Sequence, residues 1–266
     1  SLRCLTANAQ DALKVIDEET KPAEQVEIPR PTIITDEFIA EETWDRRNPP
    51  KYFVYKFGTD EFEVAEKIET GEVDSKRRKI IYVPVDNDHL RMGLVILPEK
   101  PVECSFDEAY QEGCDLALSI YDCEENKLNA FKLNIAIAQG SWFLHRFVTN
   151  SRLTIAGMGR FAPVLAYRGP SGSGKNRALN ATRLNAHRSF YDQATTRVPS
   201  IYRPLDLWQG TLCIDECDLG RSDETAEFVH YLNCRCYGTP IARQNPDSPR
   251  ISEAFDNFGL TVVTQR

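Results

Sequence analysis

The pattern of hydrophobic and polar positions divides the chain into four segments. The first, residues 1–50, is polar and acidic with scattered prolines, which indicates an extended or partly disordered lead-in. One short helix is expected around residues 12–16. The first compact domain is therefore expected to begin at about residue 51.

The second segment, residues 51–104, contains several short apolar runs. Apolar side chains alternate on both sides of Gly58-Thr59-Asp60, which predicts a β-hairpin. The runs at 80–83 and 94–97 predict two further strands. Together these runs predict a small β-rich domain.

The third segment, residues 105–152, has helical periodicity. Ser105 and Glu108 have the spacing of a capping box, in which two side chains satisfy backbone N–H groups at the start of a helix. Apolar residues then recur three and four positions apart, first over 106–121 and again from Leu128. A helical pair is expected to connect the β-rich domain with the last segment.

The fourth segment, residues 153–266, alternates short apolar runs with helical stretches. This alternation predicts an α/β fold in which a parallel sheet carries helices on both faces. The expected strands include Phe161–Tyr167, Leu212–Ile214 and Leu260–Val263, and the expected helices are Lys175–Arg188 and Asp223–Leu232.

Composition and charge narrow the class of protein. The 266 residues are 41% hydrophobic and 27% charged, which is usual for a globular protein and argues against wholesale disorder. The net charge of −8 argues against a histone-like coat protein but allows a local basic groove. No apolar run approaches the ~18 residues of a transmembrane helix, so no membrane partner is expected. A soluble, cytoplasmic protein is the expectation.

The eight cysteines are spread along the chain. Their spread, the chain length and the lack of a secretory leader favour reduced thiols over a disulfide framework. The closest groups, Cys213 with Cys217 and Cys234 with Cys236, have no matching pair of histidines, so a zinc site is not expected.

A glycine-rich motif follows the first expected strand of the last segment and precedes an expected helix. It matches G-x-x-x-x-G-K. Glycines let successive backbone N–H groups surround phosphate oxygens, the helix N-terminus adds its dipole, and the lysine reaches the β- and γ-phosphates. The motif therefore predicts a P-loop that binds ATP. The expected binding residues are Gly169, Pro170, Ser171, Gly172, Ser173, Gly174, Lys175 and Asn176.

Asn176 departs from this motif, which calls for serine or threonine after the lysine to bind Mg²⁺. An amide oxygen can also ligate Mg²⁺, as an asparagine does in protein kinases. Nucleotide binding with Mg²⁺ is still expected, but the substitution opens the alternative that hydrolysis is weakened or lost.

Two further strand ends complete the expected site. Asp215 and Glu216 follow a buried strand, at the edge of the sheet where ligands bind in such folds. There Asp215 is expected to hold Mg²⁺ and Glu216 to polarise the attacking water. Thr264 ends the last strand and is the candidate sensor of the γ-phosphate, and Arg266 is a candidate phosphate or interface arginine.

Two basic stretches could contact nucleic acid, but each could also be an ordinary solvent-exposed surface. Lys76–Lys79 is interpreted as a solvated loop beside a strand. The second stretch follows the P-loop and is expected to be either helix surface or a DNA-facing edge. Its residues are Arg177, Arg183, His187, Arg188 and Arg197.

With these motifs placed, residues 105–266 resemble the AAA+-like P-loop ATPases of archaeal, plasmid and viral replication elements. Those proteins often accompany a primase and act as helicases or helicase-like motors. Residues 1–104 carry no such resemblance. The segments that carry it are Arg168–Ala178, Ala194–Thr196, Ser200–Arg203, Gly210–Asp218 and Phe258–Arg266.

The resemblance implies a DNA-dependent ATP hydrolase. It implies that Lys175 binds phosphate, that Asp215 and Glu216 handle Mg²⁺ and the attacking water, and that Thr264 is the sensor; these make Lys175, Glu216 and Thr264 the expected catalytic residues. Asn176 departs from the family pattern, and its expected role as a second Mg²⁺ ligand beside Asp215 rests on its amide oxygen alone. It also implies single-stranded DNA as a partner and a homo-oligomeric ring, in which an arginine from one subunit completes the site of its neighbour.

The resemblance also bears on the ends of the chain. Such cores usually continue with another strand and a helical lid after the sensor strand, whereas this chain stops at Arg266. It begins at Ser1 without a methionine. We therefore expect a piece of a longer protein, truncated at the C-terminus of its ATPase core.

Two alternatives to the motor remain open. The first is a non-motor P-loop phosphotransferase such as a nucleotide kinase, although a glutamate directly after Asp215 disfavours it. The second is a nucleotide-binding regulatory module with weak or no hydrolysis, in which Asn176 marks the lost turnover.

Overall fold

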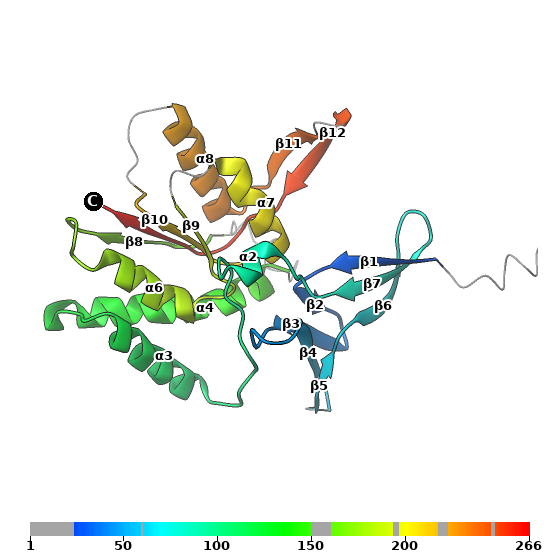
Figure 1. The fold of residues 1–266 in the computed structure, drawn as a ribbon, viewed down its shortest axis with the longest axis horizontal. Helices are drawn as coiled ribbons and strands as arrows, with labels where there is room; N and C mark the ends of the chain where they lie inside the picture. Colours follow the sequence, from blue (N-terminus) through cyan, green and yellow to red (C-terminus); the bar gives the residue numbers. More distant parts are fainter. Residues whose placement is uncertain (1–23, 60, 150–160, 194–196, 218–222, 246–247) are drawn as a thin grey trace, which may run out of the picture.

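The protein is described by a computed structural model (Figure 1). The expected short helix around residues 12–16 lies outside the described residues. The described ranges are 24–59, 61–149, 161–193, 197–217, 223–245 and 248–266.

The expected lead-in is wrong for residues 25–43, which form three strands. Strand β1 (Gln25–Pro29) pairs in parallel with β7 (Lys79–Val83). Strand β2 (Thr32–Ile34) pairs antiparallel with β3 (Phe38–Thr43). Pro29 ends β1 and Pro31 directly precedes β2, where a missing N–H is tolerated, and Ile33 and Ala40 are buried.

The expected hairpin is confirmed as β4 (Lys51–Lys56) and β5 (Glu61–Ala65), which continue the β2–β3 sheet. A second sheet has the order β1–β7–β6, with β6 at Ile68–Val73. The two sheets share a core that includes Ile33, Tyr52 and Tyr82. The β-rich domain therefore begins near residue 25, before the predicted boundary.

The strand expected at 94–97 is wrong. Within this run only Val95 pairs, in an isolated antiparallel bridge with Phe190. Val95 and Leu97 are buried in a cluster built mainly by later residues of the chain. The run is apolar because it packs against the α/β unit, after the short helix α2 (Asp88–Arg91).

The expected helical pair is confirmed as α3 (Phe106–Ile120) and α4 (Leu128–Thr149). The 3₁₀ turn η1 (Glu125–Lys127) precedes α4. Ser105 caps α3, and both hydrogen bonds of the predicted capping box with Glu108 are present. The capping box therefore sets the start of the pair.

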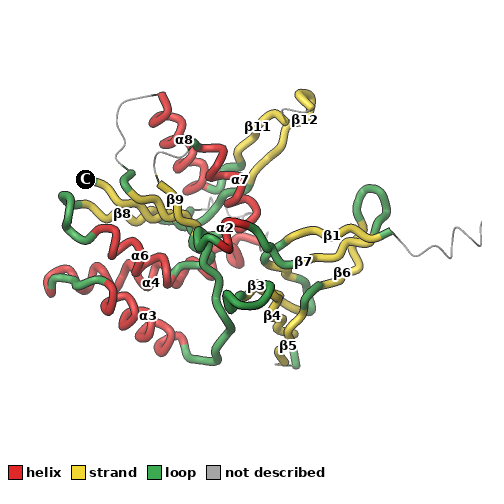
Figure 2. Tube along the Cα trace, viewed as in Figure 1, coloured by secondary structure: helices red, strands yellow, loops and turns green. Residues whose placement is uncertain are grey.

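The rest of the chain contains a parallel sheet of order β8–β13–β10–β9, with helices on both faces (Figures 1 and 2). All three pairings are parallel, as the alternating pattern predicted. The four strands are β8 (Val164–Arg168), β9 (Phe190–Gln193), β10 (Leu212–Asp215) and β13 (Thr261–Gln265).

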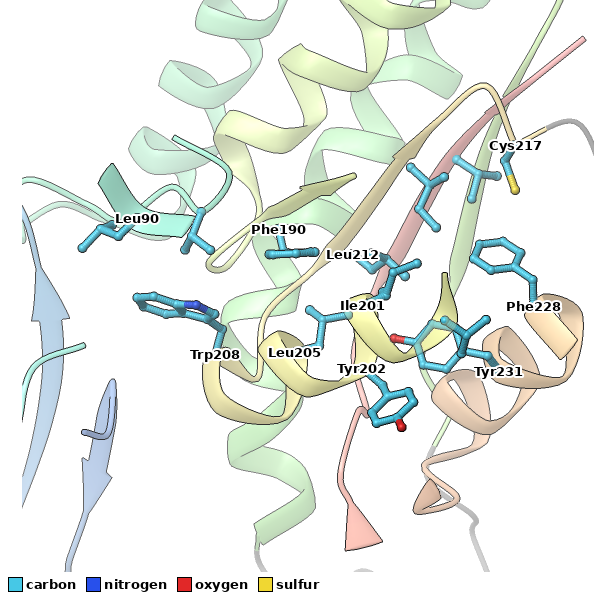
Figure 3. Close-up of a cluster of buried hydrophobic side chains, with 14 of the residues drawn as sticks. Leu90, Phe190, Ile201, Tyr202, Leu205, Trp208, Leu212, Cys217, Phe228 and Tyr231 are labelled. Atoms are coloured by element: carbon cyan, nitrogen blue, oxygen red, sulfur yellow. The ribbon is translucent and has the colours of Figure 1, made fainter. Parts of the chain in front are cut away.

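The two faces of this sheet are covered by different helices. Helices α3, α4 and α6 (Lys175–Asn185) lie on one side, and α7 (Val198–Trp208) and α8 (Asp223–Tyr237) lie on the other (Figure 1). Along β10, Leu212 and Ile214 join the α7–α8 cluster shown in Figure 3, whereas Cys213 joins the cluster on the α6 side. Strand β10 is therefore buried on both faces, as its continuous apolar run predicted.

Within the described residues of 153–266, four elements were not predicted individually. Strand β9 is short and partly polar, and α7 contains Pro199 in its first turn and Pro204 inside it. A hairpin of β11 (Ile241–Asn245) and β12 (Ser248–Phe255) follows α8. In each of these, tertiary contacts outweigh a weak local signal.

Candidate nucleotide site

The glycine loop runs from the end of β8 to the start of α6. Its backbone has positive φ at Gly172 (80°) and Gly174 (82°), which is the region that favours glycine. Gly174 is the N-cap of α6, and a Cβ added there would lie 3.1 Å from Cε2 of Tyr121. Glycine at 174 is therefore needed both for the turn and for the close approach of the α3–α4 connection.

A cavity of about 530 Å³ lies over this loop. It is bounded by the loop, by the start of α6, and by residues at the carboxyl ends of β10 and β13. Ligands of open α/β sheets bind at this edge. The lining residues are Ser171, Gly172, Ser173, Gly174, Lys175, Asn176, Arg177, Glu216, Thr264, Gln265 and Arg266.

Lys175 places its ammonium group across the glycine loop. Nζ donates hydrogen bonds to the carbonyl oxygens of Gly169 (2.7 Å) and Pro170 (2.8 Å). The positive charge is thus held at the loop and borders the cavity, where it can meet an anion.

Asn176 and Asp215 are in direct contact although they come from different elements. Nδ2 of Asn176 donates a hydrogen bond of 2.6 Å to Oδ2 of Asp215. Because the amide nitrogen makes this bond, the carbonyl oxygen of the same amide is directed away from Asp215. Asp215 is only 6% exposed and lies behind Asn176, which is exposed and lines the cavity.

Thr264 lies beside Asp215 because β13 is the neighbour of β10 in the sheet. Its hydroxyl donates to Oδ1 of Asp215 at 2.6 Å and accepts from the backbone N–H of Glu216 at 2.8 Å. The same N–H also donates to Oδ1 of Asp215 at 2.9 Å. Thr264 therefore joins the ends of two strands through one buried hydroxyl.

Glu216 is the exposed acid of the site. Its φ is 54°, an uncommon value for a residue with a side chain. This turn of the backbone follows β10 directly, and the exposed residue borders the cavity. Two adjacent carboxylates thus have different surroundings, since Asp215 is buried and hydrogen-bonded while Glu216 is exposed.

Tyr191 is a fourth neighbour of Asp215, and the sequence analysis missed it. It lies on β9, and its hydroxyl donates to Oδ2 of Asp215 at 3.3 Å. Burial first, and then the charge of Asp215, raise the pKa of Tyr191, so the phenol stays protonated near neutral pH. No motif marks a lone tyrosine in a four-residue strand, so only the strand order could have revealed it.

Arg183 was expected on a helix surface or a DNA-facing edge, but it is half-buried and its guanidinium packs against Tyr191. Its guanidinium lies 4.9 Å from the centre of the Tyr191 ring and donates to the carbonyl oxygens of Gly93 and Leu94. Burial lowers the pKa of Arg183, but an arginine remains charged at any ordinary pH. Arg183 therefore joins α6 to the chain segment after α2.

The expectation that His187 and Arg188 form part of an exposed basic surface is wrong, because both residues are buried. Arg188 is 1% exposed and donates to the carbonyls of Trp208 (3.1 Å) and Pro31 (2.8 Å). It also forms an ion pair with Glu41, which His187 contacts at 3.2 Å. Neither residue can face DNA, and together they attach the β-rich domain to the α/β unit. Arg177 and Arg197 are exposed.

Most of the predicted site residues meet at one edge of the parallel sheet. Lys175, Asn176, Glu216 and Thr264 line the cavity, and Asp215 contacts two of them. Arg266, the candidate phosphate or interface arginine, lines the same cavity. Asp215, Glu216 and Thr264 were expected at strand ends on this edge, and hydrogen bonds join them there.

Three further features of the described residues concern thiols, metal ligands and membrane spans. All seven cysteines of the described ranges are free, and those ranges contain no group of three or more His, Cys, Asp or Glu residues suited to a metal ion. No helix in the described ranges is both long enough and apolar enough to span a membrane. No family model and no curated protein matches this chain.

Proposed function

We propose that this chain binds ATP with Mg²⁺ at the glycine loop and hydrolyses it. One observation supports this proposal above the others. Residues from three separate elements, Lys175, Asp215 and Thr264, meet at the carboxyl edge of a parallel sheet beside a glycine loop. A loop that were merely a turn would not require a buried carboxylate and a threonine hydroxyl behind it.

The residues present fit a Mg²⁺ ion. The ion prefers hard oxygen ligands and keeps several waters. Asn176 contacts Asp215 through its amide nitrogen, which leaves the carbonyl oxygen for the ion. A serine or threonine hydroxyl combines the same two functions, since it can donate to a carboxylate and offer its oxygen to the metal. Asn176 is therefore a chemical substitute for that hydroxyl, and Asp215 supplies a negative charge behind it.

Each remaining residue has a defined task in this proposal. The backbone N–H groups at the start of α6 bind phosphate oxygens, and Lys175 leaves its loop carbonyls to bind the β- and γ-phosphates. The exposed carboxylate of Glu216 accepts a hydrogen bond from the attacking water and so orients it. Bound Mg²⁺ would neutralise charge on the phosphates. Thr264 holds Asp215 and the Glu216 backbone in register.

A motor that acts on single-stranded DNA is the form of this activity that we favour, and it rests on the resemblance to replication ATPases. A ring of subunits would place an arginine of one copy at the cavity of the next. Arg177 and Arg266 border the cavity and add positive charge to it. The cell compartment proposed for such a protein is the cytoplasm.

A nucleotide-binding regulatory module is the second candidate, and Asn176 is the observation that favours it. Its amide makes a short hydrogen bond of 2.6 Å to Asp215. If that bond persists with ATP bound, the site can hold nucleotide without turning it over.

The test is phosphate release from ATP and Mg²⁺, with and without single-stranded DNA. Lys175→Ala and Glu216→Gln should both abolish release, and only Lys175→Ala should also weaken ATP binding. Lys67→Ala and Glu61→Gln are matched controls, because both residues are exposed on the β-rich domain and should leave release unchanged.

The outcomes separate the candidates. Release that DNA stimulates supports the motor, and release that ignores DNA supports another P-loop enzyme. Binding without release supports the regulatory module. Absence of ATP binding would refute the proposal for all three.

A further inference from the structure

Asp215 has more hydrogen-bond donors around it than its expected role requires. An ionised carboxylate offers about four acceptor positions. Oδ1 accepts from the Thr264 hydroxyl and the Glu216 N–H, and Oδ2 accepts from Asn176 and Tyr191. All four positions are thus engaged. A metal ion can bind Asp215 directly only if one donor leaves.

Tyr191 is the weakest of these donors by distance but is firmly held. Its hydroxyl lies 3.3 Å from Oδ2, compared with 2.6 Å for the amide nitrogen of Asn176. Its backbone N–H donates to the carbonyl of Leu94 at 2.8 Å, and the Arg183 guanidinium covers its ring. The ring is therefore fixed by contacts that do not depend on Asp215.

We propose that Tyr191 is a positioning residue for metal binding at this site. It holds Oδ2 of Asp215 toward the amide nitrogen of Asn176, which directs the carbonyl oxygen of Asn176 toward the cavity. Asp215 then acts from behind Asn176, and the ion is bound by the Asn176 oxygen. This inference rests on the proposed function, because it assigns a role to Tyr191 only if nucleotide and Mg²⁺ bind at the glycine loop.

The same geometry would allow Tyr191 to oppose metal binding instead of supporting it. If the ion binds Oδ2 of Asp215 directly, it must displace a donor, and the longest bond, that of Tyr191, is the one to break. In that case the tyrosine hydroxyl competes with the metal, and removing it would strengthen metal binding.

Tyr191→Phe distinguishes the two roles, because it removes the hydroxyl and keeps the ring under Arg183. Tyr231→Phe is a matched control. Tyr231 is a buried tyrosine, whereas Tyr191 is half-buried, and the Tyr231 hydroxyl bonds to Oδ1 of Asn257 at 3.2 Å, away from the residues that line the cavity. The probe is a fluorescent ATP analogue, bound first in EDTA and then over a Mg²⁺ titration.

We expect Tyr191→Phe to raise the Mg²⁺ concentration for half-maximal effect about five-fold, which corresponds to about 1 kcal/mol, because the lost hydrogen bond is a long one. Affinity for the analogue in EDTA should stay the same, and Tyr231→Phe should change neither quantity. An unchanged or lower Mg²⁺ requirement in Tyr191→Phe would overturn the inference while leaving nucleotide binding intact. If the unaltered protein fails to bind the analogue, the proposed function falls, and the inference falls with it.

Discussion

Glu42 offers a quantitative test of the electrostatics at the junction between the β-rich domain and the α/β unit. Its side chain is 0% exposed, and burial raises its pKa from 4.5 to about 8. Oε2 accepts from the backbone N–H of Val85 at 3.0 Å, while Oε1 has no hydrogen-bond partner within the described residues. The folded protein therefore holds this carboxyl in its neutral form at neutral pH.

The sign of the effect on stability follows from this shift. Because the folded state raises the pKa, stability from Glu42 is fully present below pH 4.5 and is lost as the pH rises from 4.5 to about 8. At pH 7 folding must protonate a group that is ionised in the unfolded chain, which costs about 3 kcal/mol at 1.36 kcal/mol per pH unit. At pH 5 the same cost is only about 1 kcal/mol.

Glu42→Gln replaces the acid by a neutral group of the same shape, and its carbonyl can still accept from Val85. We expect it to raise the free energy of unfolding by about 3 kcal/mol at pH 7 and by about 1 kcal/mol at pH 5. Urea denaturation at several pH values between 5 and 8 measures both. A stabilisation that does not grow with pH would refute the reasoning.

Glu41→Gln is the contrasting control, on the residue that precedes Glu42 in β3. Burial alone would raise the pKa of Glu41, but the charges of Arg188 and His187 and hydrogen bonds from His187 and Thr32 lower it to about 2. Its stabilising contribution is therefore present above pH 4.5 and is lost as the pH falls toward 2. Removing the carboxylate leaves Arg188 buried without its ion partner, so we expect a loss of about 3–5 kcal/mol at pH 7.

Three further predictions concern the site and the core. Thr264→Val should lower the free energy of unfolding by about 2 kcal/mol and reduce phosphate release, because Asp215 loses a short hydrogen bond; Thr264→Ser should restore most of both in the same assays. Gly174→Ala should weaken nucleotide affinity in fluorescence titrations, since φ is 82° and the new methyl group meets Tyr121. Arg235→Met should lower stability in urea by several kcal/mol, because Arg235 is buried and donates to three backbone carbonyls.

The glycine loop and the Asp215 strand could be predicted because their signals are local. The loop needs glycines at fixed positions, and a strand buried on both faces needs a continuous apolar run such as Leu212–Ile214. The capping box at Ser105 is local as well. Each of these features is decided by residues a few positions apart, so the sequence alone was sufficient.

The errors arose where distant contacts decide the structure. Prolines in residues 25–43 suggested disorder, but Pro29 ends β1, and the partner of β1 is β7, about 50 residues later in the chain. Arg188 looked like a surface cation because no local pattern reveals that Glu41 and the carbonyls of Pro31 and Trp208 surround it. Tyr191 was missed for the same reason.

The hydrogen bonds around Asp215 show why the site depends on strand order as much as on motifs. Its donors come from α6, β9, the turn after β10, and β13, and all but the turn are far from Asp215 in the chain. Thr264 reaches Asp215 only because β13 lies next to β10, and Tyr191 reaches it only because β9 lies on the other side. A change of strand order would keep every motif and lose the site. Because no single element holds Asp215 in place, nucleotide affinity should be lost whenever the parallel sheet fails to assemble as a whole.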